Sequence, residues 1–305
     1  MSQQTLLNHN KLKTYAASAS LGLTLILISL KTVAVIYTES LALLSSMIDS
    51  MADLFASGIT FWAVRISSQP ADNKHRYGHG KAEALSALLQ AAFISGSGLF
   101  VMYDGIMRII SPVLVVKTKI GIIIMLISLL LTITLILFQR YVIKKTKSQA
   151  IKADAIHYQT DVITNLIIVF SLLIVGYSNL LWIDTCVAFV IAIYLIFNAY
   201  ILGKDAVSLL MDRELKEDIR ENVIKIALSC DHINGVHDLR SHDLGGVYMF
   251  EMHLELNGNL TLYEAHNYSN IVEEKIKQQY PQSQIIIHQD PSDVTEPKLD
   301  TQLKI

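Results

Sequence analysis

Long apolar segments alternate with short polar ones over the first 211 residues, and the pattern changes after Met211. A helix needs about 20 mostly apolar residues to cross a bilayer. The apolar segments therefore predict an α-helical membrane protein with six transmembrane helices, at residues 15–38, 41–64, 84–110, 120–138, 155–176 and 181–202. Together they define a transmembrane domain at residues 15–211, which a short N-terminal tail at residues 1–14 precedes.

Basic residues between these segments predict the orientation, because cytoplasmic loops are enriched in lysine and arginine. They precede the first helix and fill the loops after the second and the fourth: Lys11, Lys13, Arg65, Lys74, Arg76, Lys81, Arg140, Lys144, Lys145, Lys147 and Lys152. Lys117 and Lys119, after the third helix, favour the opposite orientation. The majority predicts that both termini of this multi-pass protein lie in the cytoplasm.

Residues 212–292 have a mixed polar and apolar pattern and predict a small α+β domain. Helical periodicity covers residues 214–229, and two strand-like segments at 235–244 and 247–256 flank the turn dipeptide Gly245-Gly246. A second helix is expected at residues 261–280, with Thr261 as N-cap and Glu264 three residues on, followed by a strand at 283–288. The order αββαβ predicts a ferredoxin-like cytoplasmic domain, and residues 293–305 resemble a disordered tail.

Composition agrees with a membrane protein, since 52% of the residues are hydrophobic and the mean hydropathy is +0.41. The formal net charge of −2 gives no electrostatic support for nucleic-acid binding. Cys186 and Cys230 lie far apart and predict neither a disulfide framework nor a thiolate metal site. The sequence contains no Walker motif, so ATP is not expected to drive the protein, and nothing indicates an organic cofactor.

Two polar pairs interrupt the apolar segments at helical spacing, Asp49 with Asp53 and His157 with Asp161. Residues four apart lie on one face of a helix, so each pair presents two ligand groups in one direction. Carboxylates at membrane depth are costly and mark functional sites, and three carboxylates with one imidazole suit a divalent metal. The alternatives are a polar cluster that packs helices together, or ion pairs with Lys31 or Lys152.

A second group of potential ligands, Asp72, His75 and His79, falls within eight residues of the loop between the second and third helices. Together with a water molecule, these three side chains could complete a zinc site. The alternative is an ordinary solvated loop, in which aspartate and histidine are common.

Three segments resemble the cation diffusion facilitator family: QPADNKHRYGHGKAE at residues 69–83, HYQTD at 157–161 and IHQDP at 287–291. The resemblance covers nearly the whole chain. It implies a homodimer in the inner membrane that exchanges a divalent cation for protons by alternating access, and it implies no enzymatic activity. The expected cargo is Zn²⁺ or Fe²⁺, and the ligand types also admit Cd²⁺ and Mn²⁺.

The resemblance also assigns roles to individual residues. It implies that Asp49, Asp53, His157 and Asp161 form the transport site, and that Asp72, His75 and His79 form a second metal site. It implies a binuclear site in the cytoplasmic domain, with an aspartate bridging two metals, at His237, His253, His266, His288 and Asp290. Lys81 and Asp212 correspond to residues that form salt bridges at the dimer interface, and Lys31 corresponds to a family lysine whose role the sequence does not define.

Two other functions compete with transport. An intramembrane metalloenzyme is disfavoured because the chain lacks HExxH and the membrane pairs include no glutamate to act as a base. A metal sensor would use the membrane part as an anchor, which does not explain ligand groups deep in two separate helices. Metal flux across a sealed membrane separates the three functions, because only the transporter produces it.

Overall fold

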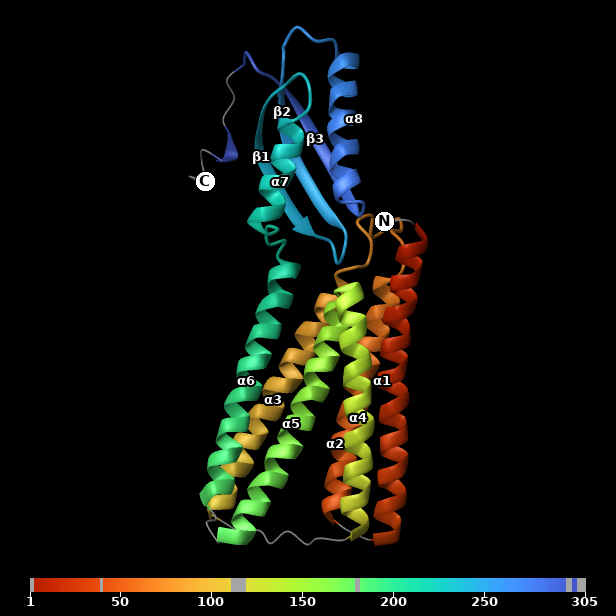
Figure 1. The fold of residues 1–305 in the computed structure, drawn as a ribbon, viewed down its shortest axis with the longest axis vertical. Coiled ribbons are helices and arrows are strands. Elements are labelled where there is room, and N and C mark those ends of the chain that lie inside the picture. Colours follow the sequence, from red (N-terminus) through yellow and green to blue (C-terminus); the bar gives the residue numbers. More distant parts are fainter. Residues whose placement is uncertain (1–2, 39–40, 111–118, 179–181, 295–297, 301–305) are drawn as a thin grey trace. The chain divides into compact units, whose positions relative to one another are not determined.

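The computed structural model describes residues 3–38, 41–110, 119–178, 182–294 and 298–300, and some side chains inside the helices, that of Asp49 among them, fall outside the description. The chain forms two compact units. The helical unit comprises residues 3–71 and 81–207, and the small domain comprises residues 72–80 and the chain from Ser208 onward. Six long helices come first: α1 (Gln3–Thr38), α2 (Leu41–Ser67), α3 (Ala82–Ile110), α4 (Lys119–Thr146), α5 (Gln149–Ser178) and α6 (Trp182–Leu210) (Figure 1).

These helices occupy the segments expected from hydropathy and extend beyond several of their ends. Helix α5 starts at Gln149 rather than near residue 155, and α4 continues to Thr146 rather than residue 138. An apolar window marks only the part of a helix that suits the bilayer, whereas the helix itself continues until a local signal stops it. At the start of α5 that signal is Ser148, whose hydroxyl accepts a hydrogen bond from the backbone N–H of Ile151 at 3.3 Å.

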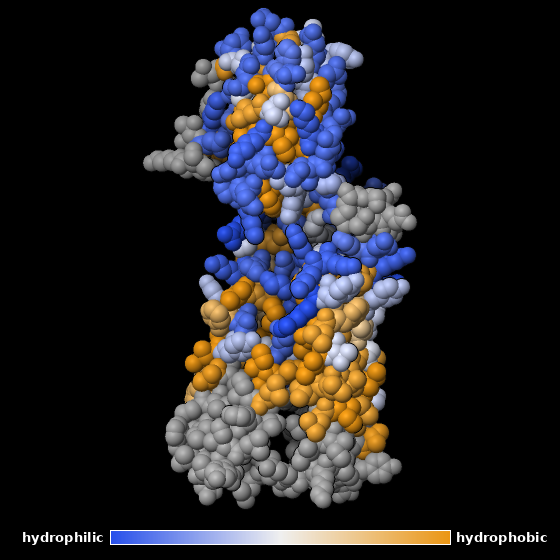
Figure 2. All heavy atoms as spheres, viewed as in Figure 1, coloured by the Kyte–Doolittle hydropathy of each residue, from blue (hydrophilic) through white to orange (hydrophobic). Residues whose placement is uncertain are grey.

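Four stretches of the described residues are long and apolar enough by themselves to cross a membrane: Asn8–Val33, Ala82–Tyr103, Leu126–Thr146 and Ala192–Leu210. They belong to α1, α3, α4 and α6, whereas α2 and α5 carry the polar pairs. On the face that Figure 2 shows, hydrophobic residues predominate among the coloured residues of the long helices, and the small domain is mostly hydrophilic. The α-helical membrane fold is therefore confirmed, and the count of six spans stays a prediction.

Small residues bring the long helices close together. One core cluster joins Ala16 and Ala17 of α1 to Val64 of α2, Val142 of α4 and Ala150 of α5. A second cluster joins α3, α5 and α6 through alanines and a few larger side chains: Ala87, Ala91, Ile94, Ala153, Leu195, Ala199, Leu202 and Ala206. Small side chains let helix backbones approach closely, which is how helices associate where lipid removes the usual hydrophobic drive. Helix α5 takes part in both clusters and is held on several sides.

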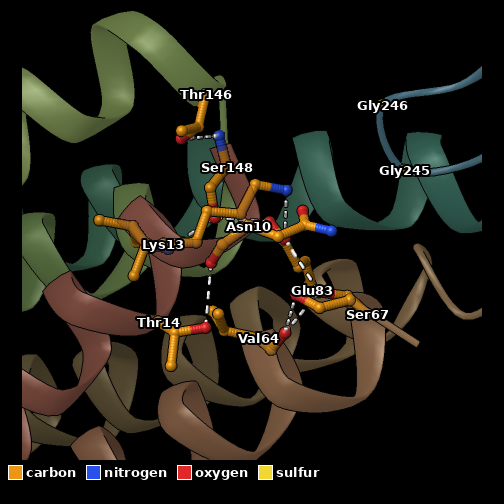
Figure 3. Close-up of polar contacts among 12 residues, drawn as sticks. Asn10, Lys13, Thr14, Val64, Ser67, Glu83, Thr146, Ser148, Gly245 and Gly246 are labelled. Carbon is orange, nitrogen blue, oxygen red and sulfur yellow. Dashed lines mark hydrogen bonds and ion pairs between the residues drawn. The ribbon is translucent and has the colours of Figure 1, made fainter. Parts of the chain in front are cut away.

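A buried carboxylate, Glu83, ties four helices together near their polar ends (Figure 3). Lys13 Nζ of α1 lies 2.9 Å from Glu83 Oε1, and Ser67 Oγ of α2 donates to the same oxygen at 3.1 Å. Ser148 Oγ, at the start of α5, donates to Glu83 Oε2 at 2.5 Å. A buried charge needs a partner and hydrogen bonds, and Glu83 has both. The junction fixes where α5 enters the bundle, and α5 carries His157 and Asp161.

The small domain has the predicted αββαβ order: α7 (Glu217–Leu228), β1 (Ile233–Asp243), β2 (Tyr248–Leu256), α8 (Leu262–Gln279) and β3 (Ser283–Pro291). Strand β2 lies between β1, with which it pairs antiparallel, and β3, with which it pairs parallel. Gly245 and Gly246 form the hairpin turn with φ of 90° and 102°, which favours glycine. Thr261 caps α8 in a capping box with Glu264, as the sequence predicted.

One face of this sheet carries the core of the domain. Alternate residues of β2 point to that face, so Phe250, Met252 and Leu254 are fully buried there with Val223 of α7 and Ile276 of α8. Helices α7 and α8 also pack on each other. The same alternation places His253 and Glu255 on the opposite face, where the polar chemistry of the domain gathers.

Two further segments pack on the small domain. The loop 72–80 approaches the hairpin turn so closely that a Cβ atom at Gly80 would lie 2.2 Å from the carbonyl oxygen of Leu244, which leaves room only for glycine. Residues 298–300 differ from the disordered tail expected from residue 293 onward. The backbone N–H of Asp300 donates to Asp238 Oδ1, and the backbone N–H of Asp238 donates to Asp300 Oδ2, each at 2.9 Å.

Candidate metal centres

Three of the four polar residues predicted in the long helices meet inside the helical unit. His157 Nε2 of α5 lies 3.0 Å from Asp53 Oδ1 of α2 and 3.7 Å from Asp161 Oδ2, one turn further along α5. One ligand atom from each of these three residues lies within 4.8 Å of the others, and His157 is buried. Asp49, the fourth predicted ligand, lies one turn before Asp53 on α2, and its side chain is outside the described part of the structure. We call these four residues the membrane cluster.

Buried hydrogen bonds hold the helix that carries His157. The hydroxyl of Tyr158 lies 2.7 Å from Thr24 Oγ1 of α1 and 2.7 Å from Ser57 Oγ of α2. One turn before His157, Asp154 accepts a hydrogen bond from Gln139 Nε2 of α4 at 2.6 Å. Hydrogen-bonded neighbours of this kind fix the orientation of a metal-binding side chain and tune its affinity. The donor set of one imidazole and carboxylates, held on two packed helices, fits a divalent cation.

The loop residues Asp72, His75 and His79 also gather, and we call them the loop cluster. Asp72 Oδ1 lies 3.4 Å from His75 Nδ1, and Asp72 Oδ2 lies 3.5 Å from His79 Nε2. Hydrogen bonds from the backbone N–H groups of His75 and Lys74 lower the pKa of Asp72, so this carboxylate stays ionised and able to bind a cation. Gly78, with φ of 87°, turns the chain between the two histidines.

The strand register explains how distant histidines meet in the small domain. His237 of β1 pairs with His253 of β2, which pairs with His288 of β3, so three imidazoles form a row across the sheet. Two residues further along β3, on the same face, Asp290 lies buried beside this row. We call His237, His253, His288 and Asp290 the sheet cluster.

Asp290 contacts all three histidines of the sheet cluster. Its Oδ2 lies 2.8 Å from His253 Nδ1 and 3.3 Å from His237 Nε2, and its Oδ1 lies 3.1 Å from His288 Nε2. A carboxylate whose two oxygens face different imidazoles has the geometry to bridge two metal ions. His266, the fifth predicted ligand, lies elsewhere on α8, where its Nε2 lies 3.1 Å from Asn270 Nδ2.

Sequence reasoning missed two acidic residues that the structure places at or near these clusters: Asp154 and Glu255. Asp154 precedes His157 by three residues and so shares its helix face, a signal that the apolar window hid because it began at residue 155. Glu255 follows His253 by two residues on β2 and so shares its sheet face. Its Oε1 lies 3.2 Å from His237 Nδ1.

The remaining predicted residues are placed as follows. Lys31 of α1 donates a hydrogen bond from Nζ to Ser50 Oγ of α2 at 2.5 Å. Ser50 directly follows Asp49 in the sequence. Lys81 belongs to the helical unit and Asp212 to the small domain. Asp212 Oδ1 lies 3.7 Å from His242 Nε2. The pairing of Lys81 with Asp212 between protomers stays a prediction.

A helical membrane unit with a buried His–Asp cluster, joined to a small αββαβ domain with a cluster of its own, defines a metal-handling membrane protein. Comparison with known families agrees. A family model described as the cation efflux transmembrane domain matches residues 17–211, and one described as the cation efflux protein cytoplasmic domain matches residues 215–292. The chain therefore belongs to the cation efflux family, the cation diffusion facilitators, as its motifs indicated.

Curated relatives share most of their length with this chain. The cation-efflux pump FieF of Citrobacter koseri is 41% identical over 288 residues, which cover 94% of this chain and 95% of the relative. FieF of Escherichia coli strain K12 / DH10B is 40% identical over 289 residues, with the same coverage.

Solved structures of related proteins align with part of the chain. The putative zinc transporter CzrB in its Zn form is 25% identical and covers 28% of this chain and 99% of its own, with a TM-score of 0.27. The metal-bound C-terminal domain of the CzcD transporter from Thermotoga maritima is 19% identical and covers 27% of this chain and 100% of its own, with a TM-score of 0.26.

Proposed function

We propose that this protein exports divalent metal cations, Zn²⁺ or Fe²⁺ with Cd²⁺ as a further candidate, from the cytoplasm in exchange for protons. The observation that carries the proposal is the membrane cluster, in which Asp53 of α2 and His157 and Asp161 of α5 direct ligand atoms at one another. Ionisable side chains facing each other inside a membrane bundle mark an ion pathway. The relatives named as cation-efflux pumps support the direction of transport.

Proton exchange follows from the chemistry of the ligands. A metal binds the neutral imidazole of His157 and the ionised carboxylates of Asp53 and Asp161, so it competes with protons for the same atoms. If the cluster opens to the cytoplasm and to the outside in turn, metal leaves as protons enter. Alternating access of this kind requires α2 and α5, which carry the ligands, to move relative to other helices.

We further propose that the protein works as a homodimer in the inner membrane, with both termini in the cytoplasm. Salt bridges between Lys81 of one protomer and Asp212 of the other would join the two copies near the membrane surface. The loop and sheet clusters would then bind cytosolic metal, and the sheet cluster would act as a regulatory site, with His266 completing it in the assembled protein. Metal at the sheet cluster would favour transport through a coupling free energy between two distinct sites.

Replacing His157 with aspartate is expected to change which metals are carried. The imidazole is a softer ligand than a carboxylate, so it favours Zn²⁺ and Cd²⁺ over the harder Mn²⁺. Transport of Mn²⁺ relative to Zn²⁺ should therefore rise in His157→Asp, measured as initial uptake rates into proteoliposomes across a panel of metals. Gln159→Asp is the matched control, because it adds the same carboxylate to α5 at a residue that instead pairs with Arg140. Equal metal ratios in His157→Asp and wild type would refute the assigned role.

An intramembrane metalloenzyme and a membrane-anchored metal sensor remain the competing functions. The family consists of transporters, which argues against both the enzyme and the sensor. A protein that only senses cytosolic metal would also not need ligand groups inside its membrane unit, where the membrane cluster lies. Metal flux in sealed vesicles tests the proposal against both, because an enzyme and a sensor leave the metal content of the vesicles unchanged.

A further inference from the structure

A lysine from the C-terminal end of the chain lies at the sheet cluster. Lys298 Nζ forms an ion pair with Glu255 Oε1. The neighbouring residues hold this segment in place, because the carboxylates of Asp238 and Asp300 each accept the backbone N–H of the other residue. Asp238 directly follows His237, so the segment 298–300 is anchored beside the cluster. We call residues 298–300 the C-terminal strap.

Glu255 lies on the same face of the sheet as the sheet cluster. It pairs with Asp290 across β2 and β3, two residues further along each strand than the pair of His253 and His288. On the other side it pairs with Gly235 of β1, where a Cβ atom would lie 2.5 Å from Glu255 Oε2. The absence of a side chain at Gly235 therefore lets the Glu255 carboxylate lie over β1, toward His237.

The atoms around Glu255 are arranged to face a cation. His237 Nδ1 has no hydrogen-bond partner among the described residues, although Glu255 Oε1 lies only 3.2 Å away. A carboxylate oxygen this close to an imidazole nitrogen attracts a positive charge. The ammonium of Lys298 supplies that charge, and its hydrogen bond to Glu255 in turn raises the pKa of Lys298, which keeps it protonated.

We propose that Glu255 is a cation-binding group of the sheet cluster and that Lys298 is its resident cation, which a divalent metal must displace in order to use the Glu255 carboxylate. The inference rests on the proposed binding of metal at the sheet cluster. The strap thereby sets the cytosolic metal concentration at which the cluster fills. The site can bind metal through Glu255 only in the fraction of molecules in which Lys298 has left, and its apparent affinity for metal is reduced by that fraction.

The expected size of the effect follows from the exposure of Lys298, whose side chain is 41% exposed. Exposed ion pairs of this kind contribute little, so releasing this one should tighten metal binding only by roughly two- to fivefold.

The test measures zinc binding by the purified full-length protein in detergent micelles, by titration calorimetry. Asp53→Ala and Asp72→Ala are present in every variant, so that the membrane and loop clusters are disabled and the sheet cluster dominates the signal. In this background Lys298→Ala should bind zinc roughly two- to fivefold more tightly, whereas Lys298→Arg, which keeps the charge, should match the background protein. Lys277→Ala is the matched control, because it removes an exposed lysine paired with Glu273 on α8.

Glu255→Gln separates the role of the carboxylate from that of the strap. Lys298→Ala and Glu255→Gln both lack the ion pair, and only the second also lacks a charged ligand. Glu255→Gln should therefore bind zinc more weakly than Lys298→Ala by roughly threefold or more, and adding Lys298→Ala to it should change nothing further.

Three outcomes would overturn the inference. Unchanged affinity in Lys298→Ala would show that the lysine does not compete, and equal affinity in Glu255→Gln and Lys298→Ala would show that Glu255 is not a cation-binding group. Absence of zinc binding in the background protein itself would refute the proposed metal site and the strap together. The first two outcomes with normal zinc binding in the background would leave the proposed function standing.

Discussion

Asp53→Ala is expected to reduce metal transport by about 100-fold or more while the protein still folds. Asp53 is the residue of α2 whose carboxylate lies 3.0 Å from His157 of α5, so its loss removes a predicted ligand and one of the contacts between the two helices. Removing even a group that only supports a metal ligand costs 10- to 100-fold in affinity or activity. The measurement is the initial rate of zinc uptake into proteoliposomes at matched protein content.

Asp205→Ala is the control for this variant. Asp205 is a carboxylate of α6 that pairs with Lys152 at 3.0 Å at a more exposed position, outside the membrane cluster. Its removal should leave the uptake rate within about twofold of wild type, because exposed ion pairs contribute little. Near-normal uptake by Asp53→Ala, with the same elution volume as wild type, would remove Asp53 from the transport site.

Asp290→Ala should remove most zinc binding by the sheet cluster and weaken transport only in part. Asp290 is buried and lies within 3.3 Å of a nitrogen of each of three histidines, so one substitution affects all three histidines of the sheet cluster. Calorimetry on the full-length protein carrying Asp53→Ala and Asp72→Ala measures the binding, and vesicle uptake without those two substitutions measures the transport.

Asp293→Ala, an exposed aspartate three residues further on, is the matched control and should preserve both properties. A complete loss of uptake in a folded protein carrying only Asp290→Ala would mean that the sheet cluster is obligatory. In that case the sheet cluster would be part of the transport cycle itself, and its proposed regulatory role would be wrong.

Local signals in the sequence predicted most of the fold. Apolar runs located the six long helices, and the glycine pair 245–246 located the hairpin, because positive φ at both positions favours glycine. Thr261 and Glu264 located the start of α8 through a capping box that depends on four consecutive residues. The helical i, i+4 spacing also paired His157 with Asp161 correctly, since one turn of helix brings them together.

Features that depend on pairing between distant segments could not be read in the same way. His237, His253 and His288 meet only because three strands align in one register, which no short motif records. Glu83 contacts Lys13, Ser67 and Ser148 only because four helices pack together. The strap belongs to a C-terminal tail that was expected to be disordered because termini usually are, yet reciprocal hydrogen bonds with Asp238 hold it.

The central claim is that the membrane cluster exchanges metal for protons, and flux through reconstituted protein tests it most directly. Sealed proteoliposomes with an acidic lumen would be diluted into neutral buffer containing Zn²⁺, and zinc entry and luminal pH would be followed together. The account predicts zinc uptake coupled to a rise in luminal pH, with both signals reduced when the pH gradient is collapsed beforehand and lost when Asp53 is replaced by alanine. Zinc uptake that proceeds at the same rate without a pH gradient, or no uptake above that of empty vesicles, would contradict it.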